Sequence, residues 1–170
     1  SADLDVPNNV NCYKIVYAGL YWSSVVKGNT PMANVKFKTP GTSNYIDISG
    51  TEIYYQNSSN NRNSNTYAYY KDVTSILTAL VNPEGTYTVA NISSNTSAMM
   101  TTGRNTEGLS AGWSLFVIYE DPLLPSKYIT SFDGFTKIDN VAPNNQQSFN
   151  ISGFKTIPVG PVRAKYAFSA

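Results

Sequence analysis

The chain has 170 residues, a formal net charge of +1 and 14% charged residues. This length suits one domain with a core of its own, and the near-neutral balance excludes an electrostatic basis for binding nucleic acid or an anionic membrane. Histidine is absent and Cys12 is the single cysteine. These counts exclude His-dependent catalytic triads, paired-cysteine metal sites and a disulfide within this sequence.

The polar residues are mainly Asn, Ser and Thr, and the 13 tyrosines outnumber the 7 phenylalanines. Because uncharged polar side chains commonly cover the exposed faces of extracellular β-proteins, we expect an extracellular location. Residues 1–5 lack the basic and apolar pattern of a signal peptide. Residues 162–169 alternate like a strand just before the sequence stops. The first feature fits either a cytosolic chain or a processed or excised piece, and the second predicts an excised piece of a longer protein.

The first half of the chain reads as a series of strands. Residues 12–22 predict a long first strand, with Gly19 as a candidate bulge and Cys12 as a buried, inert thiol. Residues 35–38 alternate strictly, so Val35 and Phe37 should face the core while the two lysines face water. Two further strands are expected over residues 45–48 and 52–55, before an Asn- and Ser-rich surface loop over residues 56–66.

One short amphipathic helix is expected after this loop. Asp72 is placed to cap it, and the residues at 82–85, with Pro and Gly, should end it. Apolar residues follow the cap at helical spacing: Val73, Ile76, Leu77, Leu80 and Val81.

The second half centres on residues 115–119, which are apolar at every position. Such a run predicts a strand buried on both faces at the centre of a sheet. Residues 86–92 predict another strand, and residues 93–110 an irregular connection. Asp133-Gly134 predicts a hairpin turn between residues 128–132 and 135–138. Two last strands are expected over residues 148–151 and 162–169.

Eight to ten short strands with regular turns predict an all-β fold, an antiparallel, jelly-roll-like β-sandwich with one short helix, formed as a single domain over residues 1–170. Exposed aromatic rings beside the Asn-rich loop could stack on a sugar. The candidates for this ligand site are Tyr54, Tyr55, Tyr67, Tyr69 and Tyr70, together with Trp22. Adjacent residues of a strand point to opposite faces, so half of these rings are expected in the core.

Four acidic residues gather near the end of the apolar run, namely Glu120, Asp121, Asp133 and Asp139. With backbone carbonyls they could hold Ca²⁺, the one cofactor considered, although no EF-hand spacing supports it. Asp121 and Asp133 could equally serve an Asp-Pro corner and an Asp-Gly turn. Hydrolysis by Glu120 with Asp133 would need carboxyls about 5–9.5 Å apart in a cleft.

A set of motifs in a fixed order resembles a module found near the N-terminal parts of very large secreted bacterial surface proteins. These are the gliding-motility and adhesin-type proteins of bacteria with type IX secretion. The motifs are residues 17–22 (YAGLYW), 35–40 (VKFKTP), 87–91 (YTVAN), 111–115 (AGWSL), 119–122 (YEDP), 132–135 (FDGF), 151–154 (ISGF) and 160–162 (GPV). The resemblance spans residues 10–168, and its motifs are mostly apolar and turn residues, so it assigns no binding residue.

The resemblance implies a β-rich, non-enzymatic structural and adhesive module at the cell surface. Its expected partners are neighbouring domains or subunits of a surface fibre, and surface glycans, with no nucleic acid and no direct membrane insertion. Relatives of this kind continue with more β-structure, so an open sheet edge could be completed by a neighbouring segment. Two other readings stay open: a carbohydrate-binding module, and a fibre subunit completed by strand addition.

Overall fold

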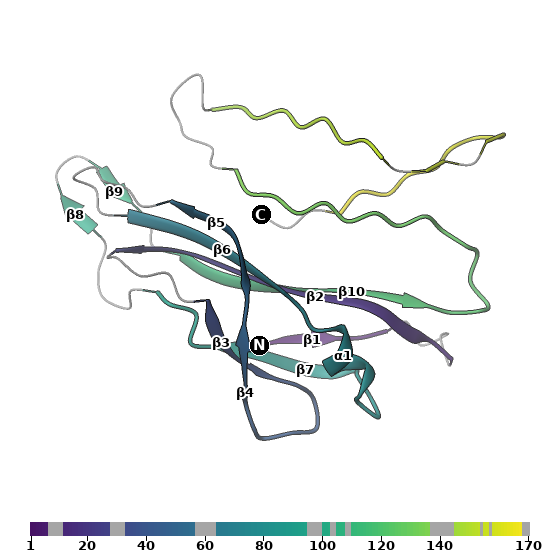
Figure 1. Cartoon of the computed structure of the whole chain (residues 1–170), viewed down its shortest axis with the longest axis horizontal. Coiled ribbons are helices and arrows are strands. Elements are labelled where there is room, and N and C mark those ends of the chain that lie inside the picture. Colours follow the sequence, from purple (N-terminus) through teal and green to yellow (C-terminus); the bar gives the residue numbers. More distant parts are fainter. Residues whose placement is uncertain are drawn as a thin grey trace. The chain divides into compact units, whose positions relative to one another are not determined.

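The structure is a computed structural model of the whole chain, and it describes residues 1–6, 12–27, 33–56, 64–94, 100–102, 105–107, 110–136, 145–153, 155–156 and 158–167 (Figure 1). The chain divides into two units, Ser1–Leu123 and Leu124–Ala170.

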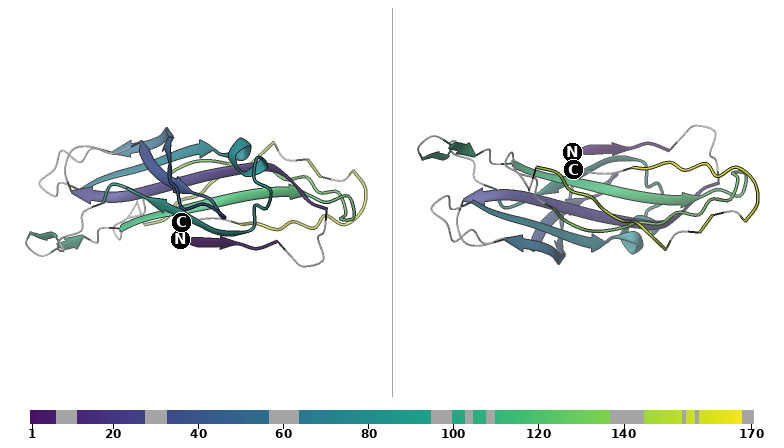
Figure 2. Two further views of the ribbon diagram at one scale, coloured as in Figure 1. Left: turned by 90° about the horizontal axis from the view of Figure 1, so that it is seen from below. Right: turned by 90° about the horizontal axis from the view of Figure 1, so that it is seen from above.

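The first unit is an antiparallel all-β sandwich, as the sequence predicts. One sheet has the strand order β1-β7-β3-β4, formed by Ala2–Leu4, Gly85–Ala90, Asn34–Lys38 and Ile46–Ser49. The other has the order β10-β2-β6-β5, formed by Ser110–Glu120, Lys14–Lys27, Ser64–Asp72 and Thr51–Gln56. Within the region predicted to be irregular, β8 (Met100–Thr102) pairs with β9 (Asn105–Glu107). Figure 2 shows the long strands of the first unit from two further sides.

Alternation places the core residues of the smaller sheet. Val35 and Phe37 of β3 are fully buried, whereas Lys36 reaches Asp47 of β4 with a 2.7 Å contact between Nζ and Oδ1. The Phe37 ring stacks on Tyr87 of β7, with 5.7 Å between the centroids. The predicted inward and outward positions of this strand are therefore confirmed.

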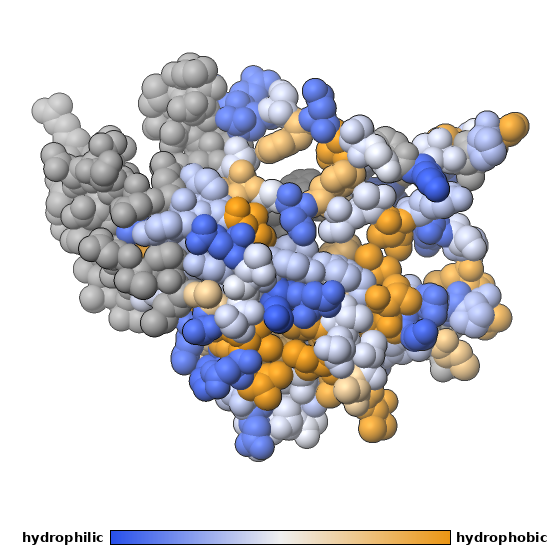
Figure 3. All heavy atoms as spheres, viewed as in Figure 1, coloured by the Kyte–Doolittle hydropathy of each residue, from blue (hydrophilic) through white to orange (hydrophobic). Residues whose placement is uncertain are grey.

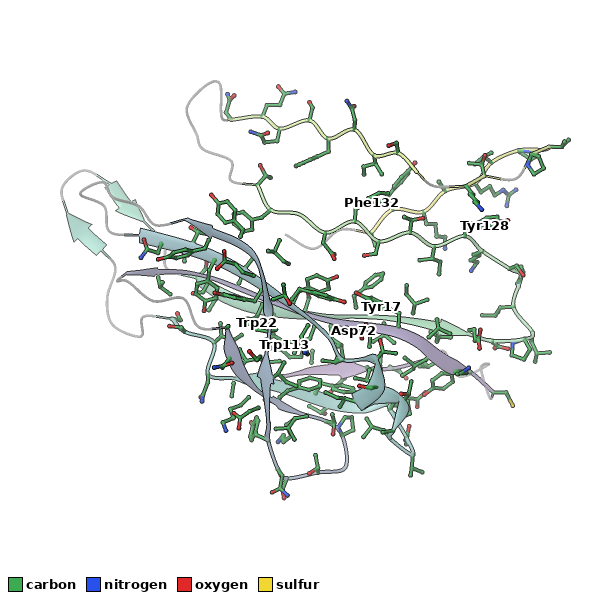
Figure 4. All side chains as sticks on the ribbon, viewed as in Figure 1. Tyr17, Trp22, Asp72, Trp113, Tyr128 and Phe132 are labelled. Carbon is green, nitrogen blue, oxygen red and sulfur yellow. The ribbon has the colours of Figure 1, made fainter. Side chains whose placement is uncertain are left out.

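The larger sheet supplies the other half of the core from its inner face. Ala18, Leu20 and Trp22 of β2 are buried, and the indole of Trp22 stacks on Tyr69 of β6 at 5.9 Å. Trp22 and Trp113 are directly opposite one another on β2 and β10 (Figure 4). The apolar side chains of both sheets form one cluster, which is the source of most of the stability of such a domain.

The position predicted for residues 115–119 is wrong. Within the described residues, β10 is an edge strand that pairs with β2 alone, and Phe116 is 38% exposed. The long strand with neighbours on both sides is β2, which pairs with β10 and β6. An apolar run indicates that both faces of a strand meet some apolar surface. It carries no information on how many hydrogen-bonded neighbours the strand has, and for this reason the prediction of a central position was wrong.

Two further expectations for the first strand are wrong. The register between β2 and β10 shifts from Tyr17 to Ile15, so the irregularity lies at Val16 and not at Gly19. Cys12 lies before the start of β2 and is exposed, so it is not a buried core thiol. Cys12 falls outside the strand because β2 begins at Lys14, two residues later than the apolar pattern suggests.

The predicted helix is present and shorter than its apolar pattern. Helix α1 spans Thr74–Thr78, and its N-cap is Val73, which makes no side-chain cap hydrogen bond, so the cap predicted at Asp72 is wrong by one residue. Asp72 lies just before the cap and accepts the backbone N–H of Thr74 at 2.9 Å. Hydrogen bonds from the Thr74 hydroxyl and backbone lower the pKa of Asp72 below its ordinary value. Leu77 is buried against the core, but Val81 is fully exposed because the helix ends before it. Val81 is therefore wrongly assigned to the buried stripe.

In the second unit, no helix or strand forms among the described residues. The strands predicted over residues 128–132, 148–151 and 162–167 form no sheet among the described residues, and the hairpin at Asp133-Gly134 does not form a ladder there. The remaining predicted positions, residues 137–138 and 168–169, lie outside the described residues. Alternation supplies strand propensity, but a stable strand also needs a paired neighbour and a face to bury. Most apolar side chains of this unit are exposed, Tyr128 at 70% and Tyr166 at 85%.

No helix among the described residues combines the length and the apolar character that crossing a membrane requires.

Burial of Tyr87 predicts a loss of stability at alkaline pH. Its hydroxyl donates to the carbonyl of Pro83 at 2.6 Å, and burial, with a smaller contribution from Tyr13, raises the pKa of Tyr87 to about 12. Below pH 10 both the folded and the unfolded chain hold this proton. Between pH 10 and 12 the unfolded chain loses it first, so the free energy of unfolding should fall by about 1.4 kcal/mol per pH unit from this residue.

The measurement is urea unfolding, followed by circular dichroism, between pH 8 and 12.5. Tyr87→Phe should make the decline above pH 10 less steep. Phe37→Leu, which alters the stacked partner without removing a proton-binding group, should lower the free energy of unfolding at every pH and leave its slope unchanged. An identical slope in the wild-type protein and in Tyr87→Phe would contradict the assignment.

Candidate functional site

Two of the five predicted sugar-stacking tyrosines are core residues. Tyr67 and Tyr69 of β6 face the sandwich interior and are 0% and 6% exposed. Their hydroxyls donate to the carbonyl of Ser93 at 2.6 Å and to Glu52 Oε2 at 3.3 Å. Burial raises the pKa of both tyrosines. These rings have no face open to a sugar, so their place in the predicted platform is a wrong assignment.

The other three predicted tyrosines divide between the two faces of the sheet. Tyr55 of β5 is half-buried and packs against the core, opposite Tyr67. Tyr54 and Tyr70 are half-buried on the outer face, because each is displaced by one residue from a core-facing position. The outer face therefore keeps two of the five predicted residues.

Aromatic residues from three strands meet on this outer face, and we call them the outer aromatic cluster: Tyr17, Tyr21, Tyr70 and Phe116. The Tyr17 hydroxyl lies 3.0 Å from that of Tyr70 and 3.3 Å from that of Tyr21. The rings of Tyr21 and Tyr70 are 5.0 Å apart and tilted by 38°, and Tyr17 meets Phe116 edge-on at 6.4 Å. A platform of two rings for a sugar would need them coplanar and exposed, and the rings of Tyr21 and Tyr70 are tilted and half-buried.

Gly19 makes room for this cluster. A Cβ at this position would lie 2.6 Å from the Tyr17 hydroxyl and 2.9 Å from a ring carbon of Tyr21. The spacing Tyr17-x-Gly19-x-Tyr21 puts all three residues on one face of β2, so a period of two read along this strand would have found the cluster. Figure 4 shows Tyr17 and Trp22, which lie on opposite faces of the strand.

The four candidate metal ligands do not form a metal site in the described part of the chain. Glu120 lies 3.7 Å from Lys14, with both side chains exposed, and Asp121 accepts the N–H of Leu123 at 2.8 Å, as its turn role predicts. Asp133 belongs to the second unit, and Asp139 lies outside the described residues. Among the described residues, no three His, Cys, Asp or Glu side chains come together to hold a metal ion.

The free edge of β10 is the feature of the sandwich most suited to binding another chain. Between Ser110 and Tyr119 this strand has no charged residue and no proline, and it spans 11 residues. Exposed strand edges attract further strands unless charge, proline, bulges or short length prevent it. From Ser110 to Ile118 none of these protections interrupts the edge, and the register irregularity between Ile118 and Tyr119 and the charge of Glu120 come only at its end.

The other three edges of the two sheets carry such protections within the described residues. β5 has Glu52 and an irregular register beside it, between Glu52 and Tyr54. β1 has three residues, including Asp3, and β4 has four residues, including Asp47. β10 therefore differs from every other edge in its length and in having its one charged residue, Glu120, at its very end.

Comparisons of the chain with protein-family models, with curated proteins and with solved structures find no match.

Proposed function

We propose that the chain is a non-enzymatic structural and adhesive module of a large bacterial cell-surface protein, which joins its neighbours by adding a strand to the free edge of β10. The observation that carries this proposal is the 11-residue edge of β10, which is uncharged from Ser110 to Tyr119, against three shorter edges that each carry an acidic residue. The ordered motifs over residues 10–168 and the Asn-, Ser- and Thr-rich composition support an extracellular setting.

Strand addition uses two kinds of contact. Backbone N–H and C=O groups of the edge supply affinity, and alternating side chains of the added strand supply specificity. On β10 the side chains beside the edge are apolar on both faces: Trp113, Leu115 and Val117 pack against the core, and Phe116 lies outward. The edge thus fits an extended, uncharged segment with apolar side chains on its two faces, and it would disfavour a segment with charged side chains.

The second unit of a neighbouring copy contains an uncharged segment, residues 128–132, that would place Tyr128 and Phe132 on one face of an added strand and Ile129 on the other. Residues 128–132 carry Tyr128, Ile129 and Phe132, which are all more than half exposed. Burying these side chains beside β10 of another copy would remove apolar surface from water at about 25 cal/mol per Å². We therefore assign the donor role to residues 128–132 and the acceptor role to β10.

Sedimentation velocity of the full chain over a range of concentrations tests the proposal. The wild-type protein should associate as concentration rises. Phe116→Lys at the acceptor and Ile129→Lys at the donor should each weaken association about tenfold or more, because a strand interface tolerates charge poorly.

Two substitutions serve as matched controls. Thr51→Lys places the same charge on the opposite edge strand β5, and Val159→Lys places it at an exposed position of the second unit outside the donor segment. Both should associate like the wild-type protein, with circular dichroism confirming that all variants are folded. A chain that stays monomeric at every concentration, or equal weakening by acceptor and control variants, would refute strand addition at β10.

A further inference from the structure

A hollow of about 400 Å³ lies at one end of the smaller sheet, lined by residues 38–42 and 84–86. The pairing of strands β3 and β7 ends at Lys38 and Thr88, and the hollow lies beyond this last pair. The turn still approaches β7 at one point, because a Cβ on Gly85 would be 3.2 Å from Pro40 Cβ, and Gly85 has a φ of 119° that favours glycine. The hollow is thus a product of the strand ends.

The polar groups of the hollow are held by neighbours. The Thr42 hydroxyl accepts the N–H of Asn44 at 3.0 Å, which leaves its proton to be donated. The Thr86 hydroxyl lies 2.6 Å from Asp3 Oδ1 and donates to it, which leaves its oxygen to accept. Each hydroxyl therefore has one hydrogen-bonding role left for a ligand, as a donor for Thr42 and as an acceptor for Thr86. Because both hydroxyls are already hydrogen-bonded, binding would cost little side-chain entropy.

The two charged groups of the hollow have opposite signs. The Lys38 ammonium lies 5.3 Å from the centre of the Tyr45 ring, and Glu84 Oε1 accepts the Tyr13 hydroxyl at 3.5 Å. An ammonium donates hydrogen bonds only, and a carboxylate accepts them only. The charges of Lys38 and Glu84 offset each other, and the Asp3 carboxylate beside the hollow already accepts the Thr86 hydroxyl, so a neutral ligand that both donates and accepts suits the hollow better than an anion.

From this geometry we infer that the hollow is a binding site for a neutral sugar. A sugar ring carries adjacent hydroxyls that each donate and accept, which matches the Glu84 acceptor, the Lys38 and Thr42 donors and the Thr86 acceptor. The Pro40 ring supplies apolar surface for sugar C–H groups. The volume is near the lower end for small-molecule sites, about 300–1,000 Å³, and suits one or two sugar units. This inference goes beyond the proposed function, because β10 takes no part in it.

Titration of the ¹⁵N-labelled full chain, followed by amide correlation spectra, tests the inference. The probes are glucose, galactose, N-acetylglucosamine, maltose, lactose and chitobiose, with glycine as a zwitterion and inorganic phosphate as an anion. At least one sugar should shift the amides of residues 38–42 and 84–86 in a saturable way, with a Kd on the order of 1 mM. Glu84→Gln and Lys38→Met should each weaken this binding about tenfold.

Lys36→Met is the matched control, because Lys36 lies two residues from Lys38 on the same outward side of β3 and is paired with Asp47. It should bind the sugar like the wild-type protein. No saturable shift with any sugar at ~100 mM, shifts only with glycine or phosphate, or unchanged binding in both Glu84→Gln and Lys38→Met would overturn the inference. Sedimentation of the unliganded chain reports on β10 separately, so either proposal can fail alone.

Discussion

Trp22→Ala is expected to lower the free energy of unfolding by about 3–5 kcal/mol, a large part of the 5–15 kcal/mol typical of a domain. The indole is 2% exposed on the sheet's long inner strand and stacks on Tyr69. Its removal would leave a cavity that neighbours on two strands cannot fill, since the backbone of β2 is held by hydrogen bonds on both sides. Chemical denaturation followed by tyrosine and tryptophan fluorescence measures the loss.

Trp113→Ala is the matched control for this substitution. Trp113 lies directly opposite Trp22 on β10 and belongs to the same core cluster, but it is half-buried on an edge strand. Its loss should cost roughly half as much, because apolar stabilisation scales with the area removed from water. Equal losses for the two tryptophans would contradict the assignment of β2 as the inner strand and β10 as the edge.

Gly50→Ala is expected to destabilise the protein by about 1–3 kcal/mol, although it adds a single methyl group. A Cβ at this position would lie 2.3 Å and 2.6 Å from two ring carbons of Trp22 and 3.1 Å from the carbonyl oxygen of Tyr70. The Gly50 N–H also donates to the carbonyl of Ala33 at 2.9 Å, which holds the backbone in place. The indole would therefore have to move within a packed core, and calorimetric unfolding would report the cost as a lower Tm.

Gly112→Ala is the control for the added methyl group. A Cβ there would meet nothing within 4 Å, so the substitution should be neutral or slightly stabilising, as expected when a strand glycine is replaced. A second check uses the double variant Gly50→Ala with Trp22→Phe. The smaller ring should relieve the clash, so the two losses should not add. Additive losses would show that Gly50→Ala acts by some route other than the indole.

The free edge and the polar hollow occupy different sheets of the sandwich. β10 closes one side of the larger sheet, and the hollow lies where β3 and β7 of the smaller sheet separate. Figure 3 shows hydrophilic and apolar residues interspersed on the visible face of the molecule. The proposed association through β10 and the inferred site in the hollow therefore use different sheets.

Local pattern was sufficient for the class of the fold and for many side-chain directions. The strict alternation at residues 35–38 predicted the buried Val35 and Phe37, and Asp72 predicted the start of α1 to within one residue of its N-cap, Val73. The reason is that strand pleat and helix caps depend on neighbours within a few residues. For the same reason, alternation along β2 already contained the outer aromatic cluster around Gly19.

Long-range pairing decided what the local pattern left open. Apolar residues at 115–119 are compatible with a central strand or an edge, and the pairing of β10 with β2 alone chose the edge. Tyr67 and Tyr69 were as suitable for a sugar platform as Tyr54 and Tyr70, and packing of the two sheets placed them in the core. The sequence by itself thus determined which residues alternate, whereas only the tertiary structure decided which face and which edge met another layer, because those contacts join residues far apart in the chain.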